Sequence, residues 1–96
     1  MSEWSVYLLR CSDNSLYTGI ATDVSRRVME HEAGKVGAKY LRGRAPYTLV
    51  YHQVVGNRSC AARVEHHIKR LTKREKESLV RSPVQFRSHI QAISEA

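Results

Sequence analysis

The chain alternates between stretches with the apolar pattern of strands and stretches with the periodicity of helices. Residues 4–11 (WSVYLLRC) and 16–20 (LYTGI) are rich in aromatic, β-branched and other apolar residues, and residues 12–15 (SDNS) between them are typical of a turn. Residues 47–55 (YTLVYHQVV) give the clearest strand pattern in the chain. The pattern therefore predicts an N-terminal β-hairpin and one further strand.

Helical periodicity is strongest in two of the remaining segments. Val24 and Val28 lie one turn apart in a segment that ends at Gly34, and a later segment carries an apolar stripe at helical spacing, formed by Ala61, Val64, Ile68 and Leu71. The capping pattern of Thr72 and Glu75 recurs at Ser82, followed by Pro83. Periodicity and capping together predict helices over residues 23–33, 36–41, 58–71 and 73–80, and a last helix from residue 83.

These elements predict an α+β fold. We expect a small three-stranded antiparallel sheet, made of the N-terminal hairpin and the central strand, flanked by four to five short helices. A chain of 96 residues suits one domain, here residues 1–96, with a core over 4–81 and a C-terminal helix over 82–96.

The hairpin loop decides whether two tyrosines share a face of the sheet. With a two-residue loop, Tyr17 would face Arg10, and Tyr7 and Tyr17 would point to opposite faces, because side chains alternate along a strand. With a three-residue loop, Tyr17 would face Leu9 and become a diagonal neighbour of Tyr7, roughly 7 Å away. A site shared by both tyrosines requires an odd-length loop or a bulge.

The charge of the chain points to a polyanionic partner. Sixteen Lys and Arg stand against nine Asp and Glu, a formal net charge of +7, and nucleic acid is the commonest partner of so basic a small domain. Residues 35–46 contain no acid, and we expect five of them to contact a phosphate backbone: Lys35, Lys39, Tyr40, Arg42 and Arg44. A solvated surface loop is the alternative for this segment.

The cysteines and the hydropathy favour a cytoplasmic protein. Cys11 and Cys60 do not form a secreted disulfide framework, although a single disulfide between them is an open alternative. No apolar run is long enough for a signal peptide or a membrane span. His66 and His67 are adjacent, so on a helix they point about 100° apart and make a poor pair of metal ligands.

Candidate catalytic groups lie on the predicted helices. Arg27 and His31 are four residues apart and should project from the same helix face. Glu65 lies on the edge of a buried apolar stripe and is the only acid between Glu32 and Glu75. A carboxylate in that position requires a partner, which we expect to be an arginine or a divalent cation.

The ordered set of Tyr7, Tyr17-Thr18-Gly19, Arg27, His31 and Glu65 resembles the GIY-YIG endonuclease superfamily over residues 5 to about 80. Residues 37–44 (GAKYLRGR) and 71–73 (LTK) are similar to its small stand-alone bacterial members, the YhbQ/YazA-like group. The first motif reads Ser5-Val6-Tyr7, so the tyrosine is kept while the glycine and isoleucine are replaced. Thr18 stands at the isoleucine position of the second motif.

This resemblance implies metal-dependent hydrolysis of phosphodiester bonds in DNA, and in RNA as a second candidate, with weak sequence specificity and a role in DNA repair or processing. It implies one Mg²⁺ or Mn²⁺ ion held by Glu65, and no small-molecule cofactor. Arg27 would neutralise charge on the phosphoryl oxygens. Tyr7 would orient or activate the attacking water, Tyr17 would position the water or the phosphate, and His31 would take a proton from Tyr7 or orient a group.

The choice of general base stays open between Tyr7 and His31. A free tyrosine has a pKa of about 10 and is a poor base at neutral pH, whereas a free histidine titrates near neutrality. A nearby cation, either Arg27 or a metal held by Glu65, would favour the phenolate.

Two other functions fit the same composition. The chain could be a nucleic-acid-binding module without catalytic activity, or an interaction domain whose basic loop meets an acidic protein. The complete set of Tyr7, Tyr17, Arg27 and Glu65 favours the enzyme over both.

Overall fold

The computed structural model describes residues 3–34 and 39–95. Within these ranges the chain forms three strands, four α-helices and one short 3₁₀ turn, and the predicted α+β class is confirmed. In chain order the elements are β1 (Trp4–Arg10), β2 (Leu16–Ala21), α1 (Val24–Glu32), the 3₁₀ turn η1 (Lys39–Leu41), β3 (Thr48–Gly56), α2 (Arg58–Lys69), α3 (Lys73–Val80) and α4 (Pro83–Ser94).

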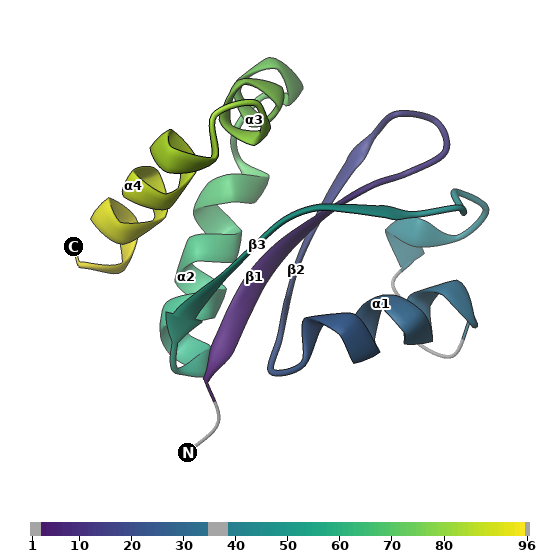
Figure 1. The fold of residues 1–96 in the computed structure, drawn as a ribbon, viewed down its shortest axis with the longest axis horizontal. Coiled ribbons are helices and arrows are strands. Elements are labelled where there is room, and N and C mark those ends of the chain that lie inside the picture. The colour runs from purple at the N-terminus through teal and green to yellow at the C-terminus, as the bar shows by residue number, and fades with distance from the viewer. Residues whose placement is uncertain (1–2, 35–38, 96) are drawn as a thin grey trace.

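The three strands form an antiparallel sheet in the order β2-β1-β3, as predicted (Figure 1). The central strand β1 is buried on both faces, which explains its nearly continuous apolar sequence. On one face Val6 and Leu8 pack in a cluster with residues of α2 and α4. On the other face Tyr7 and Leu9 pack in a cluster that Val24 and Val28 of α1 adjoin.

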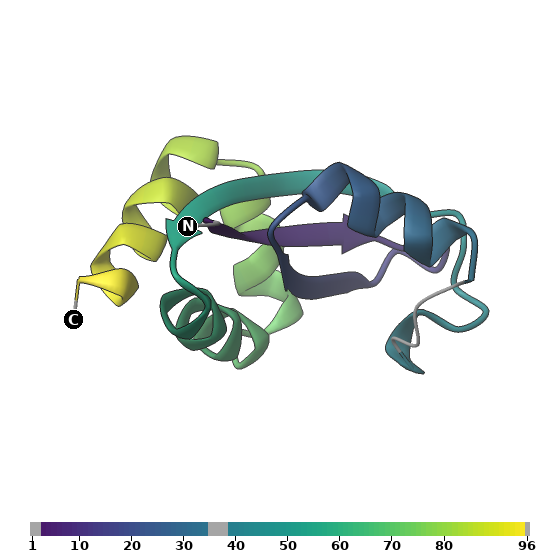
Figure 2. The ribbon, with the colours of Figure 1, turned by 90° about the horizontal axis from the view of Figure 1, so that it is seen from below.

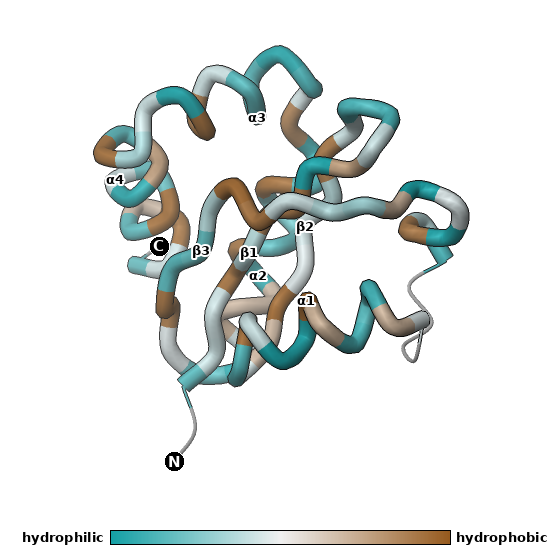
Figure 3. The backbone as a smooth tube through the Cα atoms, turned by 45° about the vertical axis from the view of Figure 1, so that its right-hand side comes forward, coloured by the Kyte–Doolittle hydropathy of each residue, from teal (hydrophilic) through white to brown (hydrophobic). Residues whose placement is uncertain are grey.

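Helices therefore cover both faces of the sheet, with α2 and α1 on opposite sides (Figure 2). Hydrophilic and hydrophobic residues alternate along α1 and α4 (Figure 3), as expected of helices that bury one side. Among the described residues no helix is both long and apolar enough to cross a membrane.

The hairpin has the three-residue loop that a shared tyrosine site requires. Leu9 pairs with Tyr17 and Tyr7 pairs with Gly19, so the two tyrosines lie on one face of the sheet. The Cys11 N–H donates to the Ser15 carbonyl at 2.9 Å and closes the loop over residues 12–14. Asn14, the last loop residue, has a φ of 69°, the left-handed conformation that this type of hairpin loop uses.

Several local predictions need correction. Of the helix expected over residues 36–41, the described part, Lys39–Leu41, is a 3₁₀ turn, and residues 35–38, which include Lys35, lie outside the described residues. The capping box at Thr72 is present, but at Ser82 the side chain makes no capping hydrogen bond, because its backbone departs from the extended geometry of an N-cap. Cys11 and Cys60 are both free, so the disulfide alternative is wrong.

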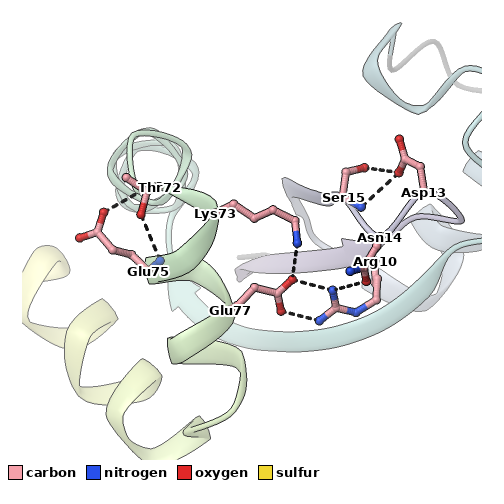
Figure 4. A network of polar contacts seen from close by, with 8 residues as sticks. All are labelled: Arg10, Asp13, Asn14, Ser15, Thr72, Lys73, Glu75 and Glu77. Carbon is pink, nitrogen blue, oxygen red and sulfur yellow. Dashed lines mark hydrogen bonds and ion pairs between the residues drawn. The ribbon is translucent and has the colours of Figure 1, made fainter.

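A partly buried ion pair joins α3 to the hairpin (Figure 4). The Arg10 guanidinium donates two hydrogen bonds of 2.7 Å to the Glu77 carboxylate, and Arg10 also bonds the Asn14 side chain in the loop. Lys73 lies 2.9 Å from the same carboxylate. The hydrogen bonds from Arg10, and then those from Lys73, lower the pKa of Glu77 to about 2.

We expect Glu77→Gln to lower the free energy of unfolding by about 2 kcal/mol at pH 7, because it removes a charge-assisted bidentate contact. The folded-state pKa of Glu77 lies below its usual value, so this stabilisation is complete above about pH 4.5 and is lost as the pH falls towards 2. Urea unfolding at pH 7 and pH 3 measures both effects. Glu95→Gln, at an exposed glutamate, is the control, and equal stability of the two variants at pH 7 would contradict the prediction.

Candidate active site

Three aromatic side chains from three elements meet on the α1 side of the sheet. The ring centroids of Tyr7 and Tyr17 are 6.3 Å apart, and the His31 ring lies 6.5 Å from Tyr7 and 5.8 Å from Tyr17. Tyr7 comes from β1, Tyr17 from β2 and His31 from the last turn of α1. The predicted catalytic tyrosines and histidine are thus brought into one cluster.

The centre of this cluster is a hydrogen bond between the Tyr7 hydroxyl and Nε2 of His31, 3.1 Å long. Both residues are almost completely buried, at 1% and 5% exposure. Burial, and then the charge of Arg27, lowers the pKa of His31, so its imidazole is neutral at pH 7. A neutral imidazole has one bare nitrogen, and Nε2 can therefore accept the Tyr7 proton.

Burial has the opposite effect on the tyrosines. It raises the pKa of Tyr7 well above its usual value, and Tyr17 adds to the effect. Arg27 lowers the pKa of Tyr7, as the sequence suggested, but its effect is smaller than that of burial. Tyr7 therefore stays protonated at neutral pH, and of the two candidate bases the residues of this site favour His31.

Gly19 makes room for the Tyr7 ring. It lies directly across from Tyr7 in the hairpin, and a Cβ atom at this position would be 2.5 Å from the Tyr7 hydroxyl oxygen and 2.6 Å from Cζ. The same atom would be 3.0 Å from Cε2 of Tyr17. The glycine of the Tyr17-Thr18-Gly19 motif is thus required by the phenol that lies over it.

Arg27 lies at the border of the cluster. Its side chain is 43% exposed and forms a loose ion pair with Glu30 at 3.7 Å. Its charge acts on the pKa of Tyr7, Tyr17 and His31, which places it within electrostatic range of all three. Arg27 also lines a cavity of about 340 Å³, whose wall includes Arg26 and Arg58 as well as the acids Asp23 and Glu30.

Glu65 has a different partner from the one predicted. Its carboxylate pairs with Lys69, one turn further along α2, at 3.4 Å, and not with an arginine. The side chain is 24% exposed. The Glu65 charge raises the pKa of both Tyr7 and Tyr17, so the carboxylate lies within electrostatic range of the phenols.

The donor set around Glu65 restricts the kind of metal ion that it could hold. Within residues 3–34 and 39–95, no group of three or more His, Cys, Asp or Glu side chains could hold a metal. One partly exposed carboxylate fits a hard ion such as Mg²⁺ or Mn²⁺, which keeps several waters and shares phosphate oxygens with its substrate. It does not fit zinc, which takes three or four protein ligands.

The predicted nucleic-acid-binding segment reaches the aromatic cluster through Tyr40. The Tyr40 ring is 5.8 Å from that of Tyr17, and the Arg44 guanidinium lies 4.5 Å above the Tyr40 ring. Arg44 also forms an ion pair with Asp13 in the hairpin loop, which neutralises part of its charge. Lys39 and Arg42 are exposed.

Two lysines near the cluster were not predicted. Lys69 and Lys76 line a cavity next to Tyr17 and Tyr40. They lie on different helices, α2 and α3, and the chain turns between them at residues 70–72. Neither lysine belongs to a sequence motif. The signal in the sequence that could have found them is the predicted turn between the two helices, which brings residues of both helices close together.

The sheet order, the paired tyrosines over Gly19 and the helical Arg27 and Glu65 define a GIY-YIG catalytic domain. The family model of that description matches residues 3–78, and the chain belongs to the GIY-YIG family. Within it, the chain is similar to UPF0213 proteins. It is 56% identical over 86 residues to a UPF0213 protein of Cronobacter sakazakii, covering 90% of each chain, and 50% identical to the UPF0213 protein YhbQ of Salmonella arizonae, covering 97% of this chain and 92% of that one.

Two solution NMR structures are similar to the fold. The UPF0213 protein of Bacillus halodurans has a TM-score of 0.53 at 47% identity, over 81% of this chain and 82% of that one. A protein of E. faecalis has a TM-score of 0.59 at 33% identity, over 85% and 86% of the two chains. The predicted membership of a small stand-alone GIY-YIG group is confirmed, and the names of these relatives specify no activity.

Proposed function

We propose that this protein is a divalent-metal-dependent endonuclease that cleaves DNA, with RNA as a second candidate substrate, and that it serves DNA repair or processing. The observation that carries the proposal is the buried hydrogen bond of Tyr7 to a neutral His31, beside Tyr17 and within range of Arg27 and Glu65. A buried acceptor for a phenolic proton has a use in proton transfer that simple packing of the sheet does not need.

The residues take the following roles in this proposal. Tyr7 hydrogen-bonds the attacking water and accepts its proton while its own proton passes to Nε2 of His31, and Tyr17 orients the water or the phosphate. Arg27 neutralises charge that develops on the phosphoryl oxygens. Glu65 would hold Mg²⁺ or Mn²⁺, which when bound supplies Lewis-acid stabilisation of the same oxygens.

We expect the wild-type protein to cleave plasmid, branched or single-stranded DNA with Mg²⁺ or Mn²⁺ and to be inactive in EDTA. Tyr7→Phe should cleave about 100-fold more slowly, because it keeps the ring and removes the proton-carrying hydroxyl. Gel assays of the two proteins on the three substrates measure this. Cleavage that survives both EDTA and the substitution would point to a contaminant and contradict the proposal.

A nucleic-acid-binding module without catalytic activity is the second candidate. The Glu65–Lys69 ion pair favours it, because the lysine competes with a metal ion for the Glu65 carboxylate. Salt-dependent binding of DNA without metal-dependent cleavage would support this function in place of the first.

A further inference from the structure

A second cavity lies beside Tyr17, and Arg27 does not line it. It has a volume of about 310 Å³, within the range of small-ligand sites, and is lined by Leu16, Tyr17, Thr18, Tyr40, Lys69 and Lys76. A smaller cavity of about 110 Å³ adjoins it, since Leu16, Tyr40 and Lys76 line both. We call the two together the Tyr40 hollow.

The walls of the Tyr40 hollow combine aromatic rings with cations. Tyr17 and Tyr40 present rings whose centroids are 5.8 Å apart, and Tyr40 is 43% exposed. The cationic residues Lys69 and Lys76 line the same cavity. Apolar and aromatic surface beside positive charge suits a ligand with a flat ring and a phosphate, which is the make-up of a nucleotide.

The lysines of the hollow differ in how their charges are balanced. Lys69 pairs with Glu65 and Lys73 pairs with Glu77, whereas among the described residues Lys76 has no ion-pair partner. Burial, and then the charge of Lys69, lowers the pKa of Lys76, so two like charges are held close together. A bound anion would relieve this repulsion.

A polar group in the wall is also without a partner. Thr18 is 2% exposed, and its hydroxyl makes no hydrogen bond within the part of the chain that the structure describes. Buried hydroxyls in folded proteins nearly always have a partner, so an unpartnered hydroxyl on a residue that lines the hollow supports the presence of a ligand or a water there.

We infer that the Tyr40 hollow binds one unpaired nucleotide of the substrate strand, with its base against Tyr40 and its phosphate at Lys76 and Lys69. Tyr17 forms a wall of the hollow, and Lys69 pairs with Glu65. If Tyr17 and Glu65 act as in the proposed function, on which this step rests, the bound nucleotide is next to the cleaved phosphate. The base must be unpaired and unstacked, because in a duplex both of its faces are covered by neighbouring bases.

Binding in EDTA tests the inference without any need for cleavage. Two labelled ligands are used, an oligothymidylate of eight nucleotides and a blunt hairpin duplex. Their fluorescence anisotropy is measured as the wild-type protein, Tyr40→Leu, Lys76→Ala or Arg74→Ala is added. Arg74 is an exposed cation on α3 that lines neither cavity, so Arg74→Ala is a control of equal net charge. Amide NMR shifts of wild-type Thr18 and Lys76 on adding the oligothymidylate locate the bound strand without a substitution.

We expect Tyr40→Leu to weaken binding of the oligothymidylate about tenfold and binding of the duplex by less than about twofold. Lys76→Ala should weaken oligothymidylate binding about tenfold relative to Arg74→Ala and reduce its salt slope by about 1. Equal binding by Lys76→Ala and Arg74→Ala, or NMR shifts that spare Thr18 and Lys76, would overturn the inference even if the protein is a nuclease. Binding that follows the expected pattern without any cleavage in Mg²⁺ or Mn²⁺ would instead refute the proposed function.

Discussion

Glu65→Gln is expected to slow metal-dependent cleavage about 100- to 1,000-fold while oligonucleotide binding in EDTA is unchanged or slightly tighter. The substitution keeps the shape of the side chain and removes the carboxylate that we assign to a hard metal ion. Binding does not suffer, because a negative charge is lost from a basic surface. Initial rates in Mg²⁺ and anisotropy in EDTA measure the two effects.

The stability of this variant should change little. The Glu65–Lys69 pair is partly exposed, with 24% and 52% of the side chains accessible, and such a pair on a helix contributes less than about 1 kcal/mol. Glu95→Gln, with the same chemical change at an exposed glutamate, should cleave at the wild-type rate. If Glu65→Gln retains wild-type cleavage and its metal dependence, the assignment of Glu65 as metal ligand is wrong.

Gly19→Ala is expected to lower the free energy of unfolding by about 1–3 kcal/mol and to slow cleavage about 100-fold. The added methyl group would lie 2.5 Å from the Tyr7 hydroxyl oxygen, so the ring must move from its hydrogen bond with His31. The lost activity follows from this displacement, because Gly19 itself carries no reactive group. Urea unfolding and cleavage rates measure the two effects.

A second background separates the clash from the backbone preference of glycine. In Tyr7→Leu the two closest ring atoms are gone and Cε2 of Tyr17, at 3.0 Å, is the close contact that stays, so adding Gly19→Ala should cost much less stability than in the wild-type background. A cost of the same size in both backgrounds would show that Tyr7 is not the reason for the glycine.

The two predictions test different parts of one arrangement. Glu65 is a group that the proposed chemistry uses directly, whereas Gly19 is a positioning residue that acts through Tyr7. Loss of activity in Gly19→Ala with intact folding and intact DNA binding would connect the Tyr7–His31 hydrogen bond to the reaction.

Local sequence determined most of the secondary structure. Strand composition at the N-terminus and at Tyr47–Val55 predicted a three-stranded antiparallel sheet, and the structure has these strands within one residue of the expected ends. Capping by Thr72 and the apolar stripe of α2 were also readable, because each depends on residues no more than a few turns apart. The order and spacing of the candidate site residues were sufficient to identify the family.

Where the sequence left alternatives, the three-dimensional structure decided them. Both hairpin loops were compatible with the residues SDNS, and the left-handed Asn14 together with the Cys11–Ser15 hydrogen bond selects the loop that puts Tyr7 and Tyr17 on one face. The sequence predicts Arg44 to be a cation that contacts phosphates, whereas in the structure it forms an ion pair with Asp13, 31 residues away in the chain.

The sequence by itself determined which side chains carry the candidate chemistry, because Tyr7, Tyr17, Arg27, His31 and Glu65 are fixed by order and spacing along local elements. Only the tertiary structure decided their protonation and their neighbours. Burial keeps the Tyr7 hydroxyl protonated and the His31 imidazole neutral. The turn between α2 and α3 brings Lys76 next to Lys69. Desolvation and charge repulsion depend on what surrounds a group in space, and these surroundings come from segments far apart in the chain.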